Sequence, residues 1–205
     1  MNNSVNAVIF DLGRVLIDVD FSRLFNDYIP AERRKQFLFN LDEIIKLPWF
    51  VEFSAGKSSV DEFFVKVKEF FQIEISQTEF RSEWSKVFKP MVGMDKLVEK
   101  VAEQMPVSLL SDTDIIHWQF LTDSYPWLRI FKNPVLSFEI GQLKPAEICY
   151  RKAAESVGQP LANCLFIDDR LINVHGAQQA GMHAIQFESS DLLSKKLQET
   201  YNIKL

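Results

Sequence analysis

The chain has 205 residues and a formal net charge of −5, so its overall charge gives no general attraction to nucleic acid or to an anionic membrane surface. Hydrophobic residues make up 47% and charged residues 25%, which excludes a largely disordered chain. The length suits one sizeable domain, or a core domain that carries a smaller inserted one.

The amino-terminal segment, MNNSVNAVIFDLG, has no basic region, and its apolar run is too short for a signal peptide. No stretch approaches the roughly 18 apolar residues of a transmembrane helix, so none is expected. The two cysteines, Cys149 and Cys164, lie in apolar stretches and are interpreted as buried free thiols rather than as a disulfide. We therefore expect a cytoplasmic protein.

Five short apolar runs, each bounded by polar or turn residues, are typical of strands buried on both faces. They cover residues 5–10, 107–110, 133–138, 164–167 and 183–187. Helical patterns lie between or after them, at residues 94–104, 114–121, 145–157, 170–180 and 190–199. Strands that alternate with helices predict an α/β fold, a Rossmann-like parallel sheet with helices on both faces.

Three residues indicate where these helices begin and end. Asp112 precedes the second helical pattern and is a candidate N-cap, because its carboxylate can accept a hydrogen bond from the first free backbone N–H groups. Pro145 suits the first turn of the third helix, and Gly181 suits the C-cap of the fourth.

Residues 20–90 differ in composition, being rich in Phe, Glu and Lys with a single glycine. Apolar residues recur there at helical spacing, in three stripes: Leu38, Leu41, Ile44, Ile45 and Leu47; Phe63, Phe64, Val67, Phe70 and Phe71; and Phe80, Trp84 and Phe88. Such stripes indicate core packing within an inserted all-helical cap. We therefore expect a catalytic core at residues 1–17 and 91–205 and a cap at residues 18–90.

Polar residues follow the predicted strands at the points where they end. Asp11 follows the first strand, Ser111 the second, and Asp168 and Asp169 the fourth, while Lys144 lies in a loop after the third. Ligands of open parallel sheets bind beyond the carboxyl ends of the strands, so we expect these side chains to meet there.

This set of residue types points to phosphoryl chemistry. Clustered carboxylates repel one another unless a cation joins them, and Mg²⁺ prefers such oxygen ligands and bridges to phosphate. A carboxylate can also attack phosphorus as a nucleophile, a lysine can stabilise the negative charge, and a hydroxyl at a helix start can bind a phosphate oxygen.

Four segments in order resemble the motifs of the haloacid dehalogenase-like hydrolases: VIFDLGRVLID at residues 8–18, LLSDTD at 109–114, GQLKP at 141–145 and FIDDRLINVHGA at 166–177. The resemblance spans nearly the whole chain. Within that superfamily, the Asp-Leu-Gly and Ser-Asp-Thr-Asp forms are most similar to the sugar-phosphate phosphatase group related to the N-terminal domain of soluble epoxide hydrolase. The insert resembles the helical cap of that group.

The resemblance implies roles for individual residues. Asp11 is the expected nucleophile and a metal ligand, Asp169 the main further Mg²⁺ ligand, Asp168 a second or water-mediated ligand, and the Gly13 carbonyl a third metal contact. Lys144 is expected to fix Asp11 and the phosphoryl group electrostatically.

On the same grounds, Ser111 and the backbone of Asp112 are expected to bind the phosphoryl group. Asn173 and Gly176 fit a turn and helix that support the fourth motif. The implied function is a magnesium-dependent phosphatase that hydrolyses a small phosphorylated metabolite, such as a sugar phosphate, through an aspartyl-phosphate.

The chain departs from the family pattern at Gly13, where the phosphatases usually carry a second aspartate that protonates the leaving group. Loss of such a general acid typically costs about 10²–10⁴-fold in rate. Asp18 or Asp20 could replace it only if the chain folds back to the site; otherwise both belong to a solvated turn or a cap hinge. Leaving groups such as those of sugar 1-phosphates would suffer least.

Two further positions leave alternatives open. Arg14 replaces a residue that is usually small, and it either contacts an anionic substrate or pairs with a cap carboxylate. Asp112 stands where Asn is common, and the N-cap interpretation is favoured for it over a side chain that faces the phosphate. His117 is interpreted as a surface or packing residue in preference to one that borders the pocket; no role is assigned to His175 or His183.

Two rival functions remain open. One is a metal-independent haloacid dehalogenase, which the pair Asp168 and Asp169 disfavours because that pair suits a cation. The other is a catalytically weak protein that binds phosphorylated ligands or regulates a partner, which Gly13 supports. The expected partner is a small phosphorylated metabolite, with no nucleic acid and no membrane, and the chain is expected to be a monomer or homodimer.

Overall fold

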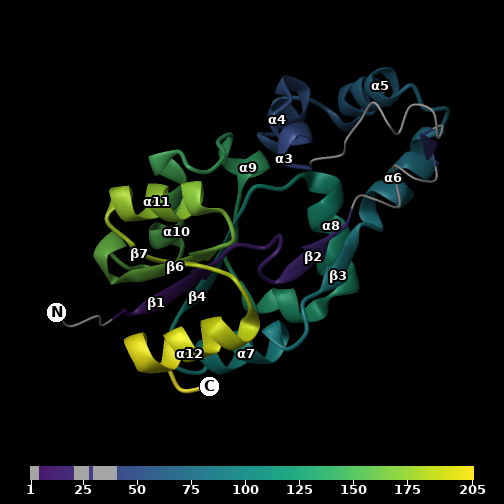
Figure 1. The fold of residues 1–205 in the computed structure, drawn as a ribbon. Helices are drawn as coiled ribbons and strands as arrows, with labels where there is room; N and C mark the ends of the chain where they lie inside the picture. The colour runs from purple at the N-terminus through teal and green to yellow at the C-terminus, as the bar shows by residue number, and fades with distance from the viewer. Residues whose placement is uncertain (1–4, 21–27, 30–40) are drawn as a thin grey trace.

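The computed structural model describes residues 5–20, 28–29 and 41–205, and its centre is a five-stranded sheet in the order β5-β4-β1-β6-β7 (Figure 1). The strands are β1 (Ala7–Phe10), β4 (Val107–Ser111), β5 (Val135–Leu136), β6 (Cys164–Asp168) and β7 (His183–Gln186). Every pairing among them is parallel. The five predicted strands and the parallel sheet are therefore confirmed.

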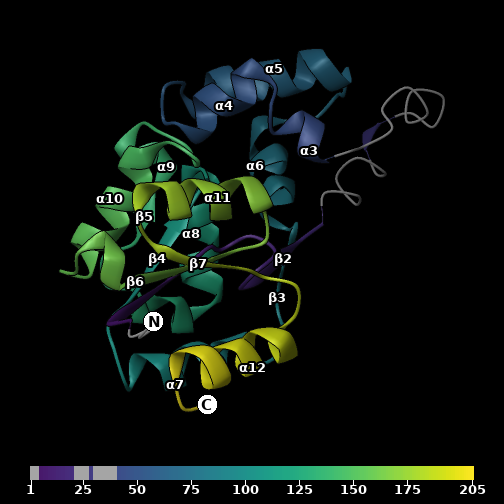
Figure 2. The ribbon, with the colours of Figure 1, turned by 60° about the vertical axis from the view of Figure 1, so that its left-hand side comes forward.

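Alternating residues of β1 explain why helices cover both faces of the sheet. Ala7 and Ile9 share a core with α10 (Glu147–Ser156) and α11 (Leu171–Ala180), whereas Val8 and Phe10 share one with α7 (Met94–Ala102) and α12 (Ser190–Tyr201). Figures 1 and 2 show these two helical layers on opposite sides of the sheet. A strand buried on both faces needs a continuous apolar run, which the sequence AVIF supplies.

The predicted helices are present, but two of their predicted starts are wrong. Helix α8 (Ile115–Ser124) is capped by Asp114, whose side chain accepts from the backbone N–H groups of Ile116 and His117, and not by Asp112. Helix α10 begins at Glu147, so Pro145 precedes the N-cap residue instead of occupying the first turn. Gly181 ends α11 in the left-handed conformation, as predicted.

In the described residues, the cap contains α3 (Leu41–Ile44), α4 (Pro48–Ser54), α5 (Val60–Phe71) and α6 (Gln77–Ser85), which lie away from the sheet (Figure 1). It has a hydrophobic core of its own, confirming the packing interpretation of the Phe stripe; the core includes Phe53, Phe63, Val67, Phe71, Phe80 and Trp84. Leu38 and the side chain of Leu41, both assigned to the first stripe, lie outside the described residues.

Two short strands at the base of the cap were not expected. Strands β2 (Ile17–Val19) and β3 (Phe88–Pro90) pair antiparallel where the chain leaves the core and returns to it. Phe88 therefore belongs to a strand and not to the third helical stripe, which is wrong at that position. The cap boundary at residues 18–90 cuts through this ribbon and stays a prediction.

The remaining elements are short: η1 (Pro126–Ile130), α9 (Ser137–Ile140) and η2 (Leu161–Asn163). Cys149 and Cys164 are buried free thiols, as expected. Among the described residues, no helix is both long and apolar enough to cross a membrane.

Gly56 marks a close approach between the cap and the core. It follows α4 with φ +65°, and a Cβ atom there would lie 2.1 Å from the carbonyl oxygen of Phe138 in α9. Because that oxygen belongs to the backbone, it cannot move aside as a flexible side chain could, and only glycine fits at this position.

We predict that Gly56→Ala lowers the free energy of unfolding by about 2 kcal/mol or more, through left-handed backbone strain plus the clash with Phe138. Gly158→Ala is the matched control, because Gly158 also follows a helix, has the same φ of +65° and has nothing within 4 Å of a Cβ atom. Its cost should be about 1 kcal/mol, from backbone strain alone. Denaturant unfolding measures both, and equal losses would show that the close approach is absent.

Candidate active site

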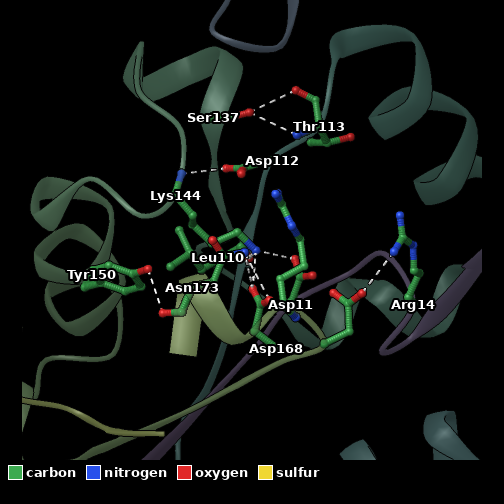
Figure 3. A network of polar contacts seen from close by, with 12 residues as sticks. Asp11, Arg14, Leu110, Asp112, Thr113, Ser137, Lys144, Tyr150, Asp168 and Asn173 are labelled. Atoms are coloured by element: carbon green, nitrogen blue, oxygen red, sulfur yellow. Dashed lines mark hydrogen bonds and ion pairs between the residues drawn. The ribbon is translucent and has the colours of Figure 1, made fainter. Parts of the chain in front are cut away.

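The carboxyl ends of three adjacent strands bring the predicted polar residues together. Asp11 follows β1, Ser111 ends β4, and Asp168 ends β6 with Asp169 directly after it. Because β1 lies between β4 and β6 in the sheet, these side chains meet at one edge. Lys144 reaches the same edge from the loop between α9 and α10 (Figure 3).

Lys144 joins the two buried aspartates. Its Nζ donates to Asp11 Oδ1 at 2.6 Å, to Asp168 Oδ2 at 2.7 Å and to the carbonyl oxygen of Leu110 at 3.3 Å. Its side chain is only 2% exposed and those of Asp11 and Asp168 are 9% and 0% exposed, so these ion pairs are largely shielded from water. Buried charges are tolerated when they are paired and hydrogen-bonded in this way.

Asp168 is held from the other side by α11. Asn173 Nδ2 donates to both carboxylate oxygens of Asp168 at 3.0 Å, and the backbone N–H of Arg170 donates to Oδ1 at 2.8 Å. The Tyr150 hydroxyl in turn donates to the backbone carbonyl oxygen of Asn173 at 2.8 Å. Asn173 therefore orients a site carboxylate directly, a sharper role than the general support that the sequence suggested.

Gly176 lets α11 come this close. A Cβ atom there would lie 2.6 Å from the Tyr150 hydroxyl and 2.7 Å from Pro145 Cβ. Because Pro145 directly follows Lys144, any larger residue at Gly176 would push the helix away from the lysine loop.

The site holds more negative than positive charge. Burial raises the pKa of Asp11 from 3.8 to about 8; the charges of Asp168 and Asp169 add to this rise, and Lys144 opposes it. Burial, together with the charge of Asp168, also raises the pKa of Asp169, while Arg14 opposes the rise. For Lys144, burial lowers the pKa, but the carboxylates around it outweigh burial and hold its pKa above the ordinary value.

The surplus of carboxylates fits a divalent cation. Asp11, Asp168 and Asp169 each place an oxygen within 4.8 Å of the others. Oxygen donors of this kind are the preferred ligands of Mg²⁺. Asn173 Oδ1, beside Asp168, is buried and has no hydrogen-bond partner among the described residues, which leaves an acceptor for a group bound at the site. The chemistry of the donor set therefore agrees with the predicted magnesium site.

Asp112 is tied to the lysine loop. Its Oδ1 accepts from the backbone N–H of Lys144 at 3.0 Å. Burial raises its pKa above the ordinary value, and Lys144 opposes that rise. The side chain that was expected to cap α8 thus holds together two loops of the site (Figure 3).

Arg14 lies at the mouth of the site with φ +59°, a left-handed conformation that is uncommon outside glycine. Its Nη1 lies 3.4 Å from Asp169 Oδ2. Arg14 thus pairs with a predicted metal ligand, a partner that neither of the two alternatives for this residue included.

A cavity of about 440 Å³ opens above the aspartates. Its lining from the core includes Asp11, Gly13, Ser111, Asp112, Lys144 and Asp169, and its lining from the cap and the β2–β3 ribbon includes Val19, Ile45, Lys46, Phe50, Val51 and Phe88. Neither Asp18 nor Asp20 is among the described residues that line it, and both are exposed, so the structure does not bring either to the site.

His117 is a buried packing residue, one of the two forms that the favoured interpretation allowed, and it also lines this cavity, as the alternative held. It contacts Asp114, the actual N-cap of α8, and Trp84 of the cap. Ser137 forms a second bridge, accepting from the backbone N–H of Thr113 and donating to the carbonyl oxygen of Ser54 in the cap at 2.6 Å. No sequence motif marked the contacts of His117 and Ser137 with the cap, because each joins residues far apart in the chain.

A family model described as haloacid dehalogenase-like hydrolase matches residues 5–181. The chain belongs to this family. The match takes in all four motifs, so the resemblance that they indicated is confirmed.

The chain is similar to a phosphatase, to a HAD family enzyme of known structure and to a dehalogenase. It is 25% identical over 198 residues to D-ribitol-5-phosphate phosphatase of Bacteroides thetaiotaomicron, with 90% of this chain and 93% of the relative covered. A HAD family enzyme of the same bacterium, solved as a magnesium complex, is 25% identical with a TM-score of 0.73, covering 93% of this chain and 98% of the other. The L-2-haloacid dehalogenase of Xanthobacter autotrophicus shares the fold, with 18% identity and a TM-score of 0.61 over 98% of this chain and 85% of the other.

We predict that magnesium stabilises this hydrolase more at about pH 8 than at about pH 6. Because the pKa of Asp11 is raised to about 8, the folded metal-free chain keeps a proton on Asp11 that the unfolded chain has lost. The stability of the metal-free chain therefore falls as pH rises from about 4 towards 8. Mg²⁺ competes with that proton and binds better once it has left.

Thermal unfolding with magnesium and with chelator, at both pH values, measures the difference. Asp169→Asn is the control and should reduce the magnesium-dependent shift at each pH. A shift of equal size at the two pH values in the unaltered chain would contradict the proposed proton.

Proposed function

We propose that the chain is a magnesium-dependent phosphatase that hydrolyses a small phosphorylated metabolite through an aspartyl-phosphate on Asp11. The observation that carries this proposal is Lys144 held between Asp11 and Asp168 at 2.6 and 2.7 Å. That contact keeps one aspartate oxygen engaged and directs the nucleophile toward the cavity above it.

In the first step, an Asp11 carboxylate oxygen forms a bond to phosphorus while the bond from phosphorus to the leaving oxygen breaks. Ser111 and the backbone of Asp112 would bind the phosphoryl oxygens, and Lys144 would stabilise their charge. Asp11, Asp168, Asp169 and the Gly13 carbonyl would hold Mg²⁺, which would supply the charge neutralisation that brings two anions together. Water then forms a bond to the phosphorus of the aspartyl-phosphate while the bond from phosphorus to the Asp11 oxygen breaks. The Asp11 carboxylate is restored, and inorganic phosphate leaves with the protons of the water.

A sugar phosphate is the substrate class that we propose for this site. The relative named D-ribitol-5-phosphate phosphatase supports it, as does a cavity of about 440 Å³, which suits a small metabolite. Arg14 and Lys46 line the cavity and would contact the substrate beyond its phosphate, while the cap helices would exclude water.

Gly13 is the observation that favours the second candidate, a weakly catalytic protein that binds phosphorylated ligands. Among the described residues that line the cavity, none occupies the position of the missing acid. We favour the phosphatase because the nucleophile, the lysine and the carboxylate cluster are all assembled. That cluster also weighs against a metal-independent dehalogenase, which has no use for a cation.

We predict that Asp11→Asn lowers magnesium-dependent phosphate release by about 10⁴-fold or more, because the covalent step needs the carboxylate. Phosphate release from a panel of sugar phosphates and nucleotides, with magnesium or chelator, measures it. Asp18→Asn is the control: Asp18 is exposed, and its side chain accepts a hydrogen bond from the backbone N–H of the neighbouring Val19, so the variant should keep full activity. Retained activity in Asp11→Asn would rule out this nucleophile.

Gly13→Asp should raise the rate on alkyl phosphates, by about tenfold or more, because it supplies a proton donor for the leaving oxygen. The site has room: a Cβ atom at Gly13 would lie 3.6 Å from Val19 Cγ2, an ordinary contact. The rate on an aryl phosphate, whose leaving group departs without a proton, should change much less. If the two substrates respond equally, the absent acid does not limit turnover.

A further inference from the structure

Three residues from two parts of the fold meet in a buried cluster beside the cavity. Asp114 caps α8, His117 lies in the first turn of that helix, and Trp84 belongs to cap helix α6. Asp114 and Trp84 are each 2% exposed and His117 is 6% exposed. The cluster directly follows the loop of Ser111 and Asp112, so it connects the cap to the proposed phosphate-binding segment.

The hydrogen bonds of Asp114 favour its ionised form. Its Oδ1 accepts from the backbone N–H groups of Ile116 at 2.9 Å and His117 at 3.0 Å. Its Oδ2 accepts from Trp84 Nε1 at 3.2 Å and lies 2.8 Å from His117 Nδ1. Three N–H donors occupy three of the roughly four lone-pair positions of the carboxylate, and the fourth position faces His117 Nδ1.

The electrostatics of Asp114 agree with this count. Burial raises the pKa of the Asp114 carboxyl, but the charge and hydrogen bonds of His117 and the bond from Trp84 outweigh burial, so that the pKa lies below its ordinary value.

Both ring nitrogens of His117 face acceptors. Nδ1 faces the ionised Asp114, and Nε2 lies 2.9 Å from the backbone carbonyl oxygen of Trp84. A carbonyl oxygen cannot donate, and neutral imidazole carries a single N–H, so a neutral ring would leave one lone pair against another. Turning the ring over would place carbon atoms at both positions and lose both bonds.

We propose that His117 is an imidazolium in the native protein, and that it is a positioning residue that holds cap helix α6 against the phosphate-binding loop. One N–H bonds the core through Asp114, and the other bonds the cap through Trp84. The two bonds exist together only while the ring is charged.

The groups packed around the ring suit a cation. In the described part of the chain, the charged group that faces it is Asp114 from the N-cap of α8. Cap helix α6 contributes the Trp84 carbonyl and the Trp84 ring, which stacks on His117 with centroids 5.1 Å apart and planes 7° apart. Strand β3 contributes the ring of Phe88, in an edge contact at 4.7 Å. Aromatic faces attract a cation in a desolvated site.

Nitrogen NMR of the histidine side chains tests the charge. The chain has three histidines, and His175 is exposed while His183 is half-buried, so a His175→Gln/His183→Gln variant leaves His117 as the sole signal. At about pH 8, where an ordinary histidine of pKa about 6.5 is neutral, both ring nitrogens should show protonated, imidazolium-type shifts. A single unprotonated nitrogen at that pH would overturn the proposal.

Kinetics test the positioning role, and this arm alone rests on the proposed phosphatase function. His117→Gln keeps a donor but removes the charge, so it should raise KM for a phosphorylated substrate by roughly tenfold while changing kcat by less than about threefold. His175→Gln is the matched control and should leave both constants unchanged. A fall in kcat at unchanged KM would contradict positioning. If no phosphorylated compound is turned over, the proposed function fails, and the NMR result still decides the state of His117.

Discussion

The arrangement of the site depends on one constraint, which is the mutual repulsion of carboxylates at the end of a parallel sheet. Strands β1 and β6 are neighbours, and adjacent strands lie about 4.8 Å apart, so Asp11 and Asp168 are forced close together by the pairing that builds the fold. Lys144 lies between them and neutralises part of their charge, and Asp169 adds a third carboxylate within reach.

The residues that hold this arrangement are themselves constrained. Asn173 fixes Asp168, and Gly176 lets α11 approach the loop that carries the lysine. A divalent cation completes the balance that one ammonium group cannot supply.

The cap is fastened to the same loop that would bind the phosphoryl group. Ser137 bridges the backbone of Thr113 to Ser54 of the cap, Gly56 packs against the backbone of Phe138, and His117 joins Asp114 to Trp84. Each contact is short, and each connects the cap with the segment directly after β4 or β5. A shift of the cap would therefore move the loop that is proposed to bind the phosphoryl group, so the proposed substrate selection by the cap and phosphate binding by the core would be mechanically linked.

The strands and the cluster of polar residues at their ends were predictable because they follow from local patterns. A run such as AVIF that ends at Asp11 identifies both a buried strand and the polar residue at its carboxyl end, and topology brings three such ends to one edge. The ribbon of β2 and β3 was missed because three-residue strands carry too little periodicity, and the spacing of Phe80, Trp84 and Phe88 matches a helix equally well. Asp112 and Asp114 are chemically equivalent N-cap candidates two residues apart. Only the contact of Asp112 with Lys144, 32 positions away, decides between them.

The position of Gly13 separates two tasks that phosphatases of this family usually combine. Stabilisation of the transferred phosphoryl group needs positive charge, which Lys144 and a cation held by Asp11, Asp168 and Asp169 would supply in the proposed mechanism. Proton transfer to the leaving oxygen needs a titratable group beside it, and Gly13 offers none, while the exposed Asp18 and Asp20 do not line the cavity. With no residue assigned to the second task, the acidity of the leaving group would decide how fast a substrate of the proposed phosphatase reacts. A substrate whose leaving oxygen departs as a stable anion would need no proton donor, so the chemistry of the substrate would compensate for the residue that the chain lacks.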